Sequence, residues 1–559
     1  MPSNINIKKF IVYTVLTLVT FAVYWQVRQF EFVIIDDPVY ILENHHIQSG
    51  FTLKEIGWAF SIRDASFWHP LTWLSFISDY QLYGLEASGY HLTNLILHIL
   101  STLLLFRMFY HVTGEIWKSA FVAAFFALHP LHVESVAWIT ERKDVLSAFF
   151  WMLTLNAYVY YTEKPALKRY LLVLFSFICA LMSKSMAITL PVIMILFDYW
   201  PLKRFALKKD HLFLWQLKEK FLFFIFSVIF SILTFKAQQG LSIEYPSFPL
   251  HSRIANALIS FLTYIKKLFW PLDMTFFYPF INQYPLWQVV AVIMIIILIS
   301  IYVIVTARRF PYLLTGWLWY AITIAPVIGI IQFSSQAMAD RYIYIPSIGL
   351  SIMLAWGVPH LFQSENMRKK ILFPASLILL IILSILTWKQ CGYWKNSREL
   401  LHHALEIRND FYIVHDCLGL AMSAEGKNKE AINHFNQALL LNPDYANAYF
   451  NRGMINIKSG QYKEALQDFS ETIRLKPDYI PAYFNRAIAR SKVGKYHLAI
   501  DDYSDIIRLK PDHADAYNNR GAVYLTLGNN ELGCGDARKA CELGVCRVLE
   551  IAKSNGDCD

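Results

Sequence analysis

Long apolar runs fill the first 390 residues, and each approaches the roughly 20 residues that a helix needs to cross a lipid bilayer. The chain has 559 residues, 56% hydrophobic and 16% aromatic, but this apolar excess stops near residue 390. We therefore predict an all-α, integral multi-pass membrane domain followed by a soluble domain. About eleven spans are expected, near residues 10–28, 91–111, 118–138, 145–161, 170–186, 187–200, 220–236, 286–306, 311–333, 342–361 and 371–388.

Basic residues cluster in every second connection between the expected spans. Lys8 and Lys9 precede the first span, and the connections that read EKPALKR, PLKRFALKKDHLFLWQLKEK, ARRF and SENMRKK are all basic. Cytoplasmic loops collect Lys and Arg, so these connections are predicted to be cytoplasmic and the acidic loop 29–90 to lie outside. The net charge of +9 has this topological cause and does not indicate a nucleic-acid partner. An odd number of spans sends the chain after residue 389 to the outside.

The soluble part repeats every 34 residues. The recurring residues are Pro443, Pro477 and Pro511, Tyr449, Tyr483 and Tyr517, Asn451, Asn485 and Asn519, and Gly426, Gly460, Gly494 and Gly528. This spacing, with Gly between two helices and Pro after the second, resembles the tetratricopeptide repeat. About four copies cover 409–545, and Gly533 in place of the usual helix-B Ala indicates a C-terminal cap. Such α-solenoids bind polypeptide, so we expect a protein acceptor or partner.

The domain boundaries follow from these two patterns. We expect a membrane domain at 1–390, a linker at 391–408 and a repeat domain at 409–559. The cysteines of the soluble part match no zinc spacing, and buried small side chains are preferred over a disulfide for Cys417, Cys534, Cys541, Cys546 and Cys558.

Ionisable residues stand at the outer ends of the expected spans, where the charge rule predicts few cations. They are Asp36, Asp37, His69, Glu134, Arg142, Lys143, Lys184 and Arg341. Cations at a lipid boundary suit a lipid-linked phosphate, because they hold the phosphate and neutralise the charge it gains on leaving. A carboxylate takes the proton of an attacking hydroxyl, so Asp36, Asp37 and Glu134 are the catalytic candidates and the other residues are assigned to donor binding. For any single cation, an interfacial or capping role is the alternative.

Asp36 and Asp37 are adjacent, and Pro38 follows them. The proline ring favours an extended backbone at Asp37, and neighbouring side chains of an extended segment point to opposite sides. We therefore expect only one of the two carboxylates to act as the base.

The motifs that carry these residues occur together in one known family. The Asp pair, HPL followed by aromatics, LHPLHVESVAWITERKDVLS, DRYIYIPSIGL and the trailing repeats resemble the transmembrane and tetratricopeptide-repeat proteins, which are similar to protein O-mannosyltransferases of the GT-C glycosyltransferase class. The resemblance covers nearly the whole chain. It implies an inverting transferase that moves a sugar from a polyprenyl-phosphate carrier to an acceptor outside the membrane. It also places Asp36 in the catalytic motif and Arg341 and Tyr342 near the donor, whereas Asp37 departs from the Glu common in the family.

His129 and His132 lie three residues apart, with Glu134 close by. Because no third fixed ligand accompanies them, we interpret both histidines as structural. Some GT-C enzymes use a divalent ion, so Mg²⁺ or Mn²⁺ at Asp36 stays open as the alternative, and no other cofactor is expected.

Asn451, Asn485 and Asn519 recur at one point of the first helix of each repeat, where the resemblance implies the concave face. A primary amide is both donor and acceptor, so a ladder of them can bind the backbone of an extended polypeptide acceptor. A solvated or capping Asn is the alternative.

Two other function classes stay open beside a transferase of mannose-like sugar to Ser or Thr. A transporter would use Lys184 and Asp198 as a relay, but the membrane part lacks obvious internal repetition. A non-catalytic scaffold that displays the repeats leaves the Asp pair unexplained. We expect a bacterial-type inner membrane with periplasmic repeats, or an endoplasmic reticulum membrane with lumenal repeats.

Overall fold

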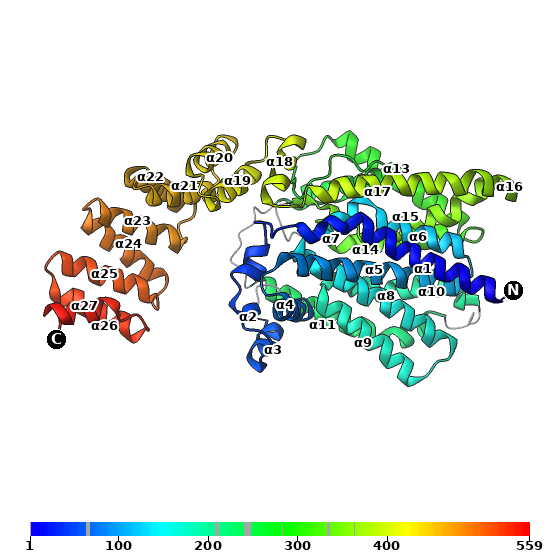
Figure 1. Cartoon of the computed structure of the whole chain (residues 1–559), viewed down its shortest axis with the longest axis horizontal. Coiled ribbons are helices and arrows are strands. Elements are labelled where there is room, and N and C mark those ends of the chain that lie inside the picture. The colour runs from blue at the N-terminus through cyan, green and yellow to red at the C-terminus, as the bar shows by residue number, and fades with distance from the viewer. Residues whose placement is uncertain are drawn as a thin grey trace. The chain divides into compact units, whose positions relative to one another are not determined.

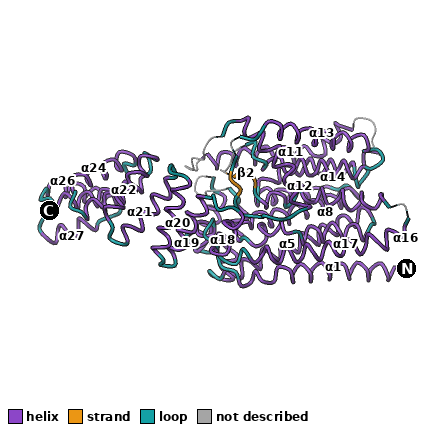
Figure 2. The backbone as a smooth tube through the Cα atoms, turned by 90° about the horizontal axis from the view of Figure 1, so that it is seen from above, coloured by secondary structure: helices purple, strands orange, loops and turns teal. Residues whose placement is uncertain are grey.

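A computed structural model of the chain describes residues 2–62, 68–206, 212–239, 248–281, 283–331, 336–362 and 364–559. Residues 207–211, part of one basic connection, lie outside the described residues. The described chain is helical apart from two short strands (Figure 2), which confirms the all-α class. It forms two compact units, Met1–Ile407 and Arg408–Asp559, called unit 1 and unit 2.

Unit 1 is a bundle in which α8 packs against α5 and α9, and α14 packs against α15 (Figure 1). Its helices are α1 (Pro2–Tyr24), α2 (His45–Gln48), α3 (Leu53–Phe60), α4 (Pro70–Tyr83), α5 (Ala87–Thr113), α6 (Ile116–Leu128), α7 (Val133–Ala137), α8 (Arg142–Glu163), α9 (Leu167–Ser183), α10 (Leu190–Tyr199), α11 (Leu212–Gln239), α12 (Leu250–Phe269), α13 (Leu286–Thr306), α14 (Pro311–Ile324), α15 (Ser347–Gly357), α16 (Glu365–Met367), α17 (Phe373–Gly392) and α18 (Ser397–Ile407). The strands β1 (Tyr278–Pro279) and β2 (Gln336–Met338) pair antiparallel.

Five helical stretches of the described chain are long and apolar enough to cross a membrane, namely Asn6–Gln29, Ala87–Thr113, Leu214–Ala237, Leu286–Thr306 and Glu365–Gly392. A sixth span is counted if Ile116–Leu128 and Pro130–Ala137, which are bent by 54°, form one broken span. The expected count of about eleven is therefore not reproduced. The other five expected spans fall on α8, which has 22 residues, and partly on α9, α10, α14 and α15, which have only 17, 10, 14 and 11 residues.

Helix α8 is long enough to cross a membrane but is less apolar than the five stretches above, because part of it is buried in the bundle. The face of α8 that packs on α5 and α9 buries Asn156 and Thr154, polar residues that a lipid-facing helix avoids. The α13 window, by contrast, has a mean hydropathy of 3.2 and only 6% of it is buried. The most exposed helices are thus the easiest to recognise from composition, although α5 also passes with 44% of its window buried.

Helices α14 and α15 approach each other at two glycines. A Cβ atom built on Gly316 would lie 2.4 Å from the carbonyl oxygen of Gly349, and one on Gly349 would lie 2.3 Å from that of Gly316. Around this contact, Trp317, Tyr320 and Leu350 belong to the main buried core of unit 1. The two backbones can only pack this closely because both residues lack a side chain.

Helix α12 and the small sheet fix the segment that leads to Arg341. The amide of Asn256 donates to the Ala337 carbonyl at 2.9 Å, and the Tyr264 hydroxyl donates to the Ala339 carbonyl at 3.0 Å. The chain then turns into η8, a single 3₁₀ turn over Asp340–Ile343. Helix α12, which lies far away in sequence, therefore holds the segment that directly precedes Arg341.

The segment 391–408, expected to be a linker, is mostly ordered structure of unit 1. It contains the end of α17 and all of α18, and Trp394 stacks on Trp138 with ring centroids 5.5 Å apart. Leu400 and Leu401 of α18 are buried. The boundary between the units follows Ile407.

Unit 2 is a stack of antiparallel helix pairs. The pairs are α19 (Tyr412–Ala424) with α20 (Asn428–Leu441), α21 (Ala446–Lys458) with α22 (Tyr462–Leu475), α23 (Ile480–Lys492) with α24 (Tyr496–Leu509), and α25 (Ala514–Thr526) with α26 (Asn530–Glu542), and α27 (Arg547–Asn555) follows. The glycine between the helices of each pair is left-handed, for example Gly460 with φ +76°. This conformation explains why glycine recurs there every 34 residues.

An arginine in each of the last three repeats ties neighbouring helices together. Arg452, Arg486 and Arg520 pair with Asp468, Asp502 and Asp536, each 16 residues later, at 2.6, 2.7 and 2.7 Å. The same guanidinium groups also donate to Asn436, Ser470 and Ser504 of the preceding repeat. We call this series the Arg–Asp ladder, and it joins each repeat to the one before.

The last repeat is closed by two disulfides, Cys534–Cys558 and Cys541–Cys546. The preference for buried cysteines outside disulfides was therefore wrong for these four. Helix α27 packs on α26 and brings Cys558 to Cys534, whereas Cys541 and Cys546 are only five residues apart. Cys417 is half-buried and belongs to neither disulfide. Gly533 makes room for a neighbour, since a Cβ there would lie 2.6 Å from Leu525 Cγ.

Gly349→Ala tests the close contact of α14 and α15. The added methyl group meets backbone atoms, so we expect it to destabilise unit 1 by about 1–3 kcal/mol, the usual cost of overpacking. Thermal unfolding of the detergent-solubilised protein measures this loss. Gly57→Ala on α3 is the control, because nothing lies within 4 Å of its Cβ position. Equal unfolding temperatures for the two variants would contradict the packing described.

Candidate functional site

Asp37 anchors the first loop to the middle of the membrane unit. Its carboxylate accepts hydrogen bonds from the Val33 amide at 2.8 Å and from both the amide, at 3.2 Å, and the hydroxyl of Thr140. Burial raises the pKa of Asp37 to about 6, and these hydrogen bonds offset only part of the effect. Asp37 is 1% exposed and fully engaged in holding the loop.

The backbone at the Asp pair is not extended as expected. Asp37 has φ −58° and ψ −35°, the right-handed helical region, and it starts the single turn Pro38–Leu42. A residue before proline disfavours this region, but the three hydrogen bonds to the Asp37 carboxylate hold the chain there. The two carboxylates still have different surroundings, although the backbone at Asp37 is a turn and not a strand.

Asp36 is the partly exposed carboxylate of the pair. The cations that act on it are Lys143 and Arg341, and Glu141 is the nearby anion. Burial raises the pKa of Asp36, and Lys143 offsets only part of that rise. Its side chain accepts no hydrogen bond within the described ranges, so the carboxylate is available to take a proton.

Glu141 lies at the centre of the predicted cations. Its carboxylate is 3.2 Å from Lys143, 3.6 Å from Lys184 and 3.1 Å from Arg341 Nε. Burial raises the pKa of Glu141, but these three cations together lower it below its usual range. Lys184 also pairs with Asp144, and Arg341 also pairs with Glu134. We call these six residues, together with Asp36, the ion cluster.

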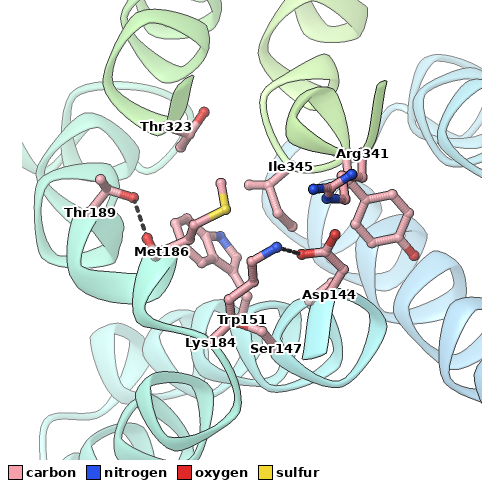
Figure 3. A pocket seen from close by; sticks show the side chains of 11 residues that line it. Asp144, Ser147, Trp151, Lys184, Met186, Thr189, Thr323, Arg341 and Ile345 are labelled. Atoms are coloured by element: carbon pink, nitrogen blue, oxygen red, sulfur yellow. Dashed lines mark hydrogen bonds and ion pairs between the residues drawn. The ribbon is translucent and has the colours of Figure 1, made fainter. Parts of the chain in front are cut away.

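A small pocket opens beside the ion cluster (Figure 3). Its cavity volume is only about 10 Å³, and Lys184, Arg341 and Asp144 are its charged lining residues. The opposite side is apolar, with Trp151, Met186 and Ile345 among its lining residues. The pocket therefore offers cations next to an apolar wall.

Three predicted donor-binding residues differ in their surroundings. Arg142 lies outside the ion cluster, because its guanidinium is fully buried and pairs with Asp79 at 2.6 Å while also donating to Asn94. His69 lies beside Lys143 and Lys184, and burial together with these cations lowers its pKa to about 3, so it is uncharged. Tyr342 is next to the cluster, with its ring centroid 5.0 Å from the Arg341 guanidinium.

His129 and His132 are both buried and hydrogen-bonded to structural partners. His129 Nε2 bonds to the Leu268 carbonyl at 2.9 Å, and His132 bonds to the Phe126 carbonyl at 2.6 Å and to Ser347 at 3.0 Å. In the part of the chain that the structure describes, no three His, Cys, Asp or Glu side chains gather as metal ligands. Among the described residues, Asp36, His129 and His132 therefore do not come together as a set of metal ligands.

The three asparagines of the repeats have unequal partners. Asn451 donates to the Asp416 carboxylate at 2.9 Å, and Asn485 donates to the carbonyl of Pro481 in its own helix. Asn519 accepts from Asn518 at 3.2 Å. The series is therefore not a uniform ladder, because the carboxylate of Asp416 occupies its first member.

Sequence reasoning missed Glu141, Asp144 and Thr140. All three stand in the run ITERKD at residues 139–144, where two carboxylates flank Arg142 and Lys143. In a sequence, acidic residues next to basic ones look like ordinary surface ion pairs. Only the three-dimensional contacts show that these residues belong to a buried site.

Family models identify the repeats of unit 2. Models described as TPR repeat or tetratricopeptide repeat match residues 419–458, 446–479 and 484–542. The 34-residue units are tetratricopeptide repeats.

Curated relatives match both units. The chain is 26% identical to protein O-mannosyl-transferase TMTC1 of Homo sapiens over 486 residues, covering 75% of this chain and 54% of that protein. It is 23% identical to protein O-mannosyl-transferase TMTC3 of Homo sapiens, covering 81% and 53%. Protein O-mannosyl-transferase F38B6.6 of Caenorhabditis elegans is 24% identical, covering 68% and 54%. The chain thus spans about half the length of the curated relatives it matches, and these findings support a repeat-containing, O-mannosyltransferase-like family.

The raised pKa of Asp37 gives stability a specific pH dependence. A carboxyl with a higher pKa in the folded state stabilises the fold below its unfolded pKa of 3.8, and this contribution is lost as the pH rises to about 6. The full loss is on the order of 3 kcal/mol. We expect the free energy of unfolding of wild type, minus that of Asp37→Asn, to fall from pH 4 to pH 7 in thermal unfolding measurements. A gap that stays constant would show that Asp37 does not titrate in this range.

Proposed function

We propose that this protein is a membrane glycosyltransferase that moves a mannose-like sugar from a polyprenyl-phosphate carrier to a Ser or Thr hydroxyl of a protein. The observation that carries the proposal is the partly exposed Asp36, on which the charges of Lys143 and Arg341 act, together with a pocket that Arg341 and Lys184 line beside apolar residues. The names of the relatives support the same class of chemistry.

Asp36 is proposed as the general base. It accepts the hydroxyl proton of the acceptor while the acceptor oxygen attacks the anomeric carbon of the sugar. The bond from that carbon to the phosphate oxygen breaks, and the phosphate leaves with the electron pair. A raised pKa makes the Asp36 carboxylate a stronger proton acceptor than an ordinary aspartate. Asp37 is not assigned this task, because three hydrogen bonds engage its carboxylate.

Lys184 and Arg341 are proposed to bind the donor phosphate, with Lys143 completing the positive side. Charge-assisted hydrogen bonds from these groups hold the phosphate and stabilise the charge it gains on leaving. Trp151, Met186 and Ile345 on the other side of the pocket suit the first isoprene units of the carrier.

The tetratricopeptide repeats are proposed to bind the polypeptide acceptor. Asn485 and Asn519 remain candidates for contacts with its backbone, whereas Asn451 would first have to leave Asp416. Binding of this kind raises the local concentration of hydroxyl side chains.

The ion cluster and the repeats are proposed to face the outside, either a bacterial-type periplasm or the lumen of the endoplasmic reticulum. Two disulfides in unit 2 support this side, because disulfides persist in oxidising compartments. The basic connections support it as well.

A transporter relay through Lys184 and Asp198 is the weaker alternative. Asp198 pairs with Lys220 at 2.8 Å and with Arg204 at 2.9 Å, whereas Lys184 pairs with Asp144 and Glu141. Lys184 and Asp198 have separate partners, and none of these ion pairs connects the two residues.

Asp36→Asn tests the assignment of the base. We expect sugar transfer to fall by about 10²–10⁴-fold, the usual contribution of general base catalysis, with donor affinity largely kept. The assay measures transfer from a defined polyprenyl-phosphate mannose to a Ser/Thr peptide. Glu43→Gln, an exposed carboxylate of the same loop, is the control. If purified wild-type protein transferred no sugar from any such donor, the function itself would be refuted, and unchanged transfer by Asp36→Asn would move the base elsewhere.

Single exposed cysteines test the orientation. In a Cys417→Ser background, Ser49→Cys and Lys463→Cys are expected to react with a membrane-impermeant thiol reagent added outside. Lys164→Cys in a basic connection is expected to react only after the membrane is opened. The reverse pattern would invert the proposed topology.

A further inference from the structure

The ion cluster holds no free positive charge for an incoming phosphate. Lys143, Lys184 and Arg341 are its three cations, and each already pairs with at least one carboxylate. The carboxylates Asp36, Glu134, Glu141 and Asp144 outnumber them by one. A phosphate that enters would therefore compete with a carboxyl group for each of the three cations, unless one of these groups gives up its place.

Glu141 is the carboxylate that contacts all three cations. Its Oε1 atom is 3.2 Å from Lys143 Nζ and 3.1 Å from Arg341 Nε, and its Oε2 atom is 3.6 Å from Lys184 Nζ. The group is 1% exposed, whereas the three cations are 12–13% exposed. A tetrahedral phosphate that bound the same three cations would occupy the space that the Glu141 carboxylate now fills.

Two of the other carboxylates have additional anchors that Glu141 lacks. Glu134 accepts the backbone amide of Arg341 at 2.9 Å, and Asp144 accepts the Ser135 hydroxyl at 3.2 Å. The Oε2 atom of Glu141 is buried and accepts no hydrogen bond from any described residue. Glu141 is therefore held by the three cations and by the neighbouring Asp144 carboxyl, with which it shares a hydrogen bond.

We propose that the Glu141 carboxylate holds the same three cations that the donor phosphate binds. In the absence of donor, its carboxylate keeps Lys143, Lys184 and Arg341 together against their mutual repulsion. When the donor binds, the phosphate takes over the three cations and Glu141 turns away. The identity of this ligand rests on the proposed function, but the exchange of one anion for another follows from the charges and distances.

The exchange predicts that removing the charge of Glu141 strengthens anion binding. The probe is a short isoprenyl methyl phosphodiester, whose single negative charge does not titrate near neutral pH. We expect full-length Glu141→Gln in detergent to bind this probe at least about tenfold more tightly than wild type, because a competing anion is gone. Glu115→Gln, an exposed carboxylate paired with Lys118, is the matched control and is expected to bind like wild type. Unchanged or weaker binding by folded Glu141→Gln would overturn the proposal.

A charge-balanced background covers the case in which Glu141→Gln does not fold. Lys143→Gln removes one cation, and Lys143→Gln with Glu141→Gln restores the original balance. The double variant is expected to bind the probe more tightly than the single variant, and equal or weaker binding would overturn the exchange.

Transfer assays separate this result from the proposed function. Tighter probe binding without any sugar transfer would leave the exchange standing and refute the transferase. Intact transfer by wild type, with unchanged or absent probe binding by Glu141→Gln, would overturn the exchange and leave the transferase standing. Neither transfer nor probe binding would refute both.

Discussion

Four segments that are far apart in sequence meet because buried charges must be paired. Asp36 comes from the first loop, Glu141 from the turn before α8, Lys184 from the end of α9 and Arg341 from the turn before α15. An unpaired charge in this position costs several kcal/mol, so each segment is fixed by the needs of the others. The same requirement leaves the cluster short of positive charge, which is why binding an anion there involves an exchange rather than a simple addition.

Most members of this cluster were predicted because they are charged residues at the outer ends of expected spans, where the charge rule predicts few cations. Lys143, Lys184 and Arg341 do lie together, and Asp36, Glu134 and His69 are beside them. Arg142 does not, because it and Lys143 are adjacent on a helix and point in different directions. A sequence pattern places a residue at one end of a span but does not tell which way its side chain faces.

Other differences have tertiary causes that no local pattern contains. Asp37 is helical rather than extended because Thr140, about a hundred residues away, donates to its carboxylate. The 34-residue spacing did predict the repeats, since every glycine in that series marks a left-handed turn. The pairing of Cys534 with Cys558 depends on where α27 folds, which the spacing of cysteines leaves open.

The Arg–Asp ladder is absent from the first repeat, where Leu418 and His434 stand at the positions of the Arg and the Asp. His434 instead faces His415, with their Nδ1 atoms 3.2 Å apart. At the other end of unit 2, Cys534–Cys558 and Cys541–Cys546 fasten the last helices. In a stack whose repeats touch only their neighbours, cooperativity is graded along the array. Amide hydrogens of α19 and α20 therefore exchange with solvent first, and unit 2 frays from its N-terminal repeat while its C-terminal cap stays closed.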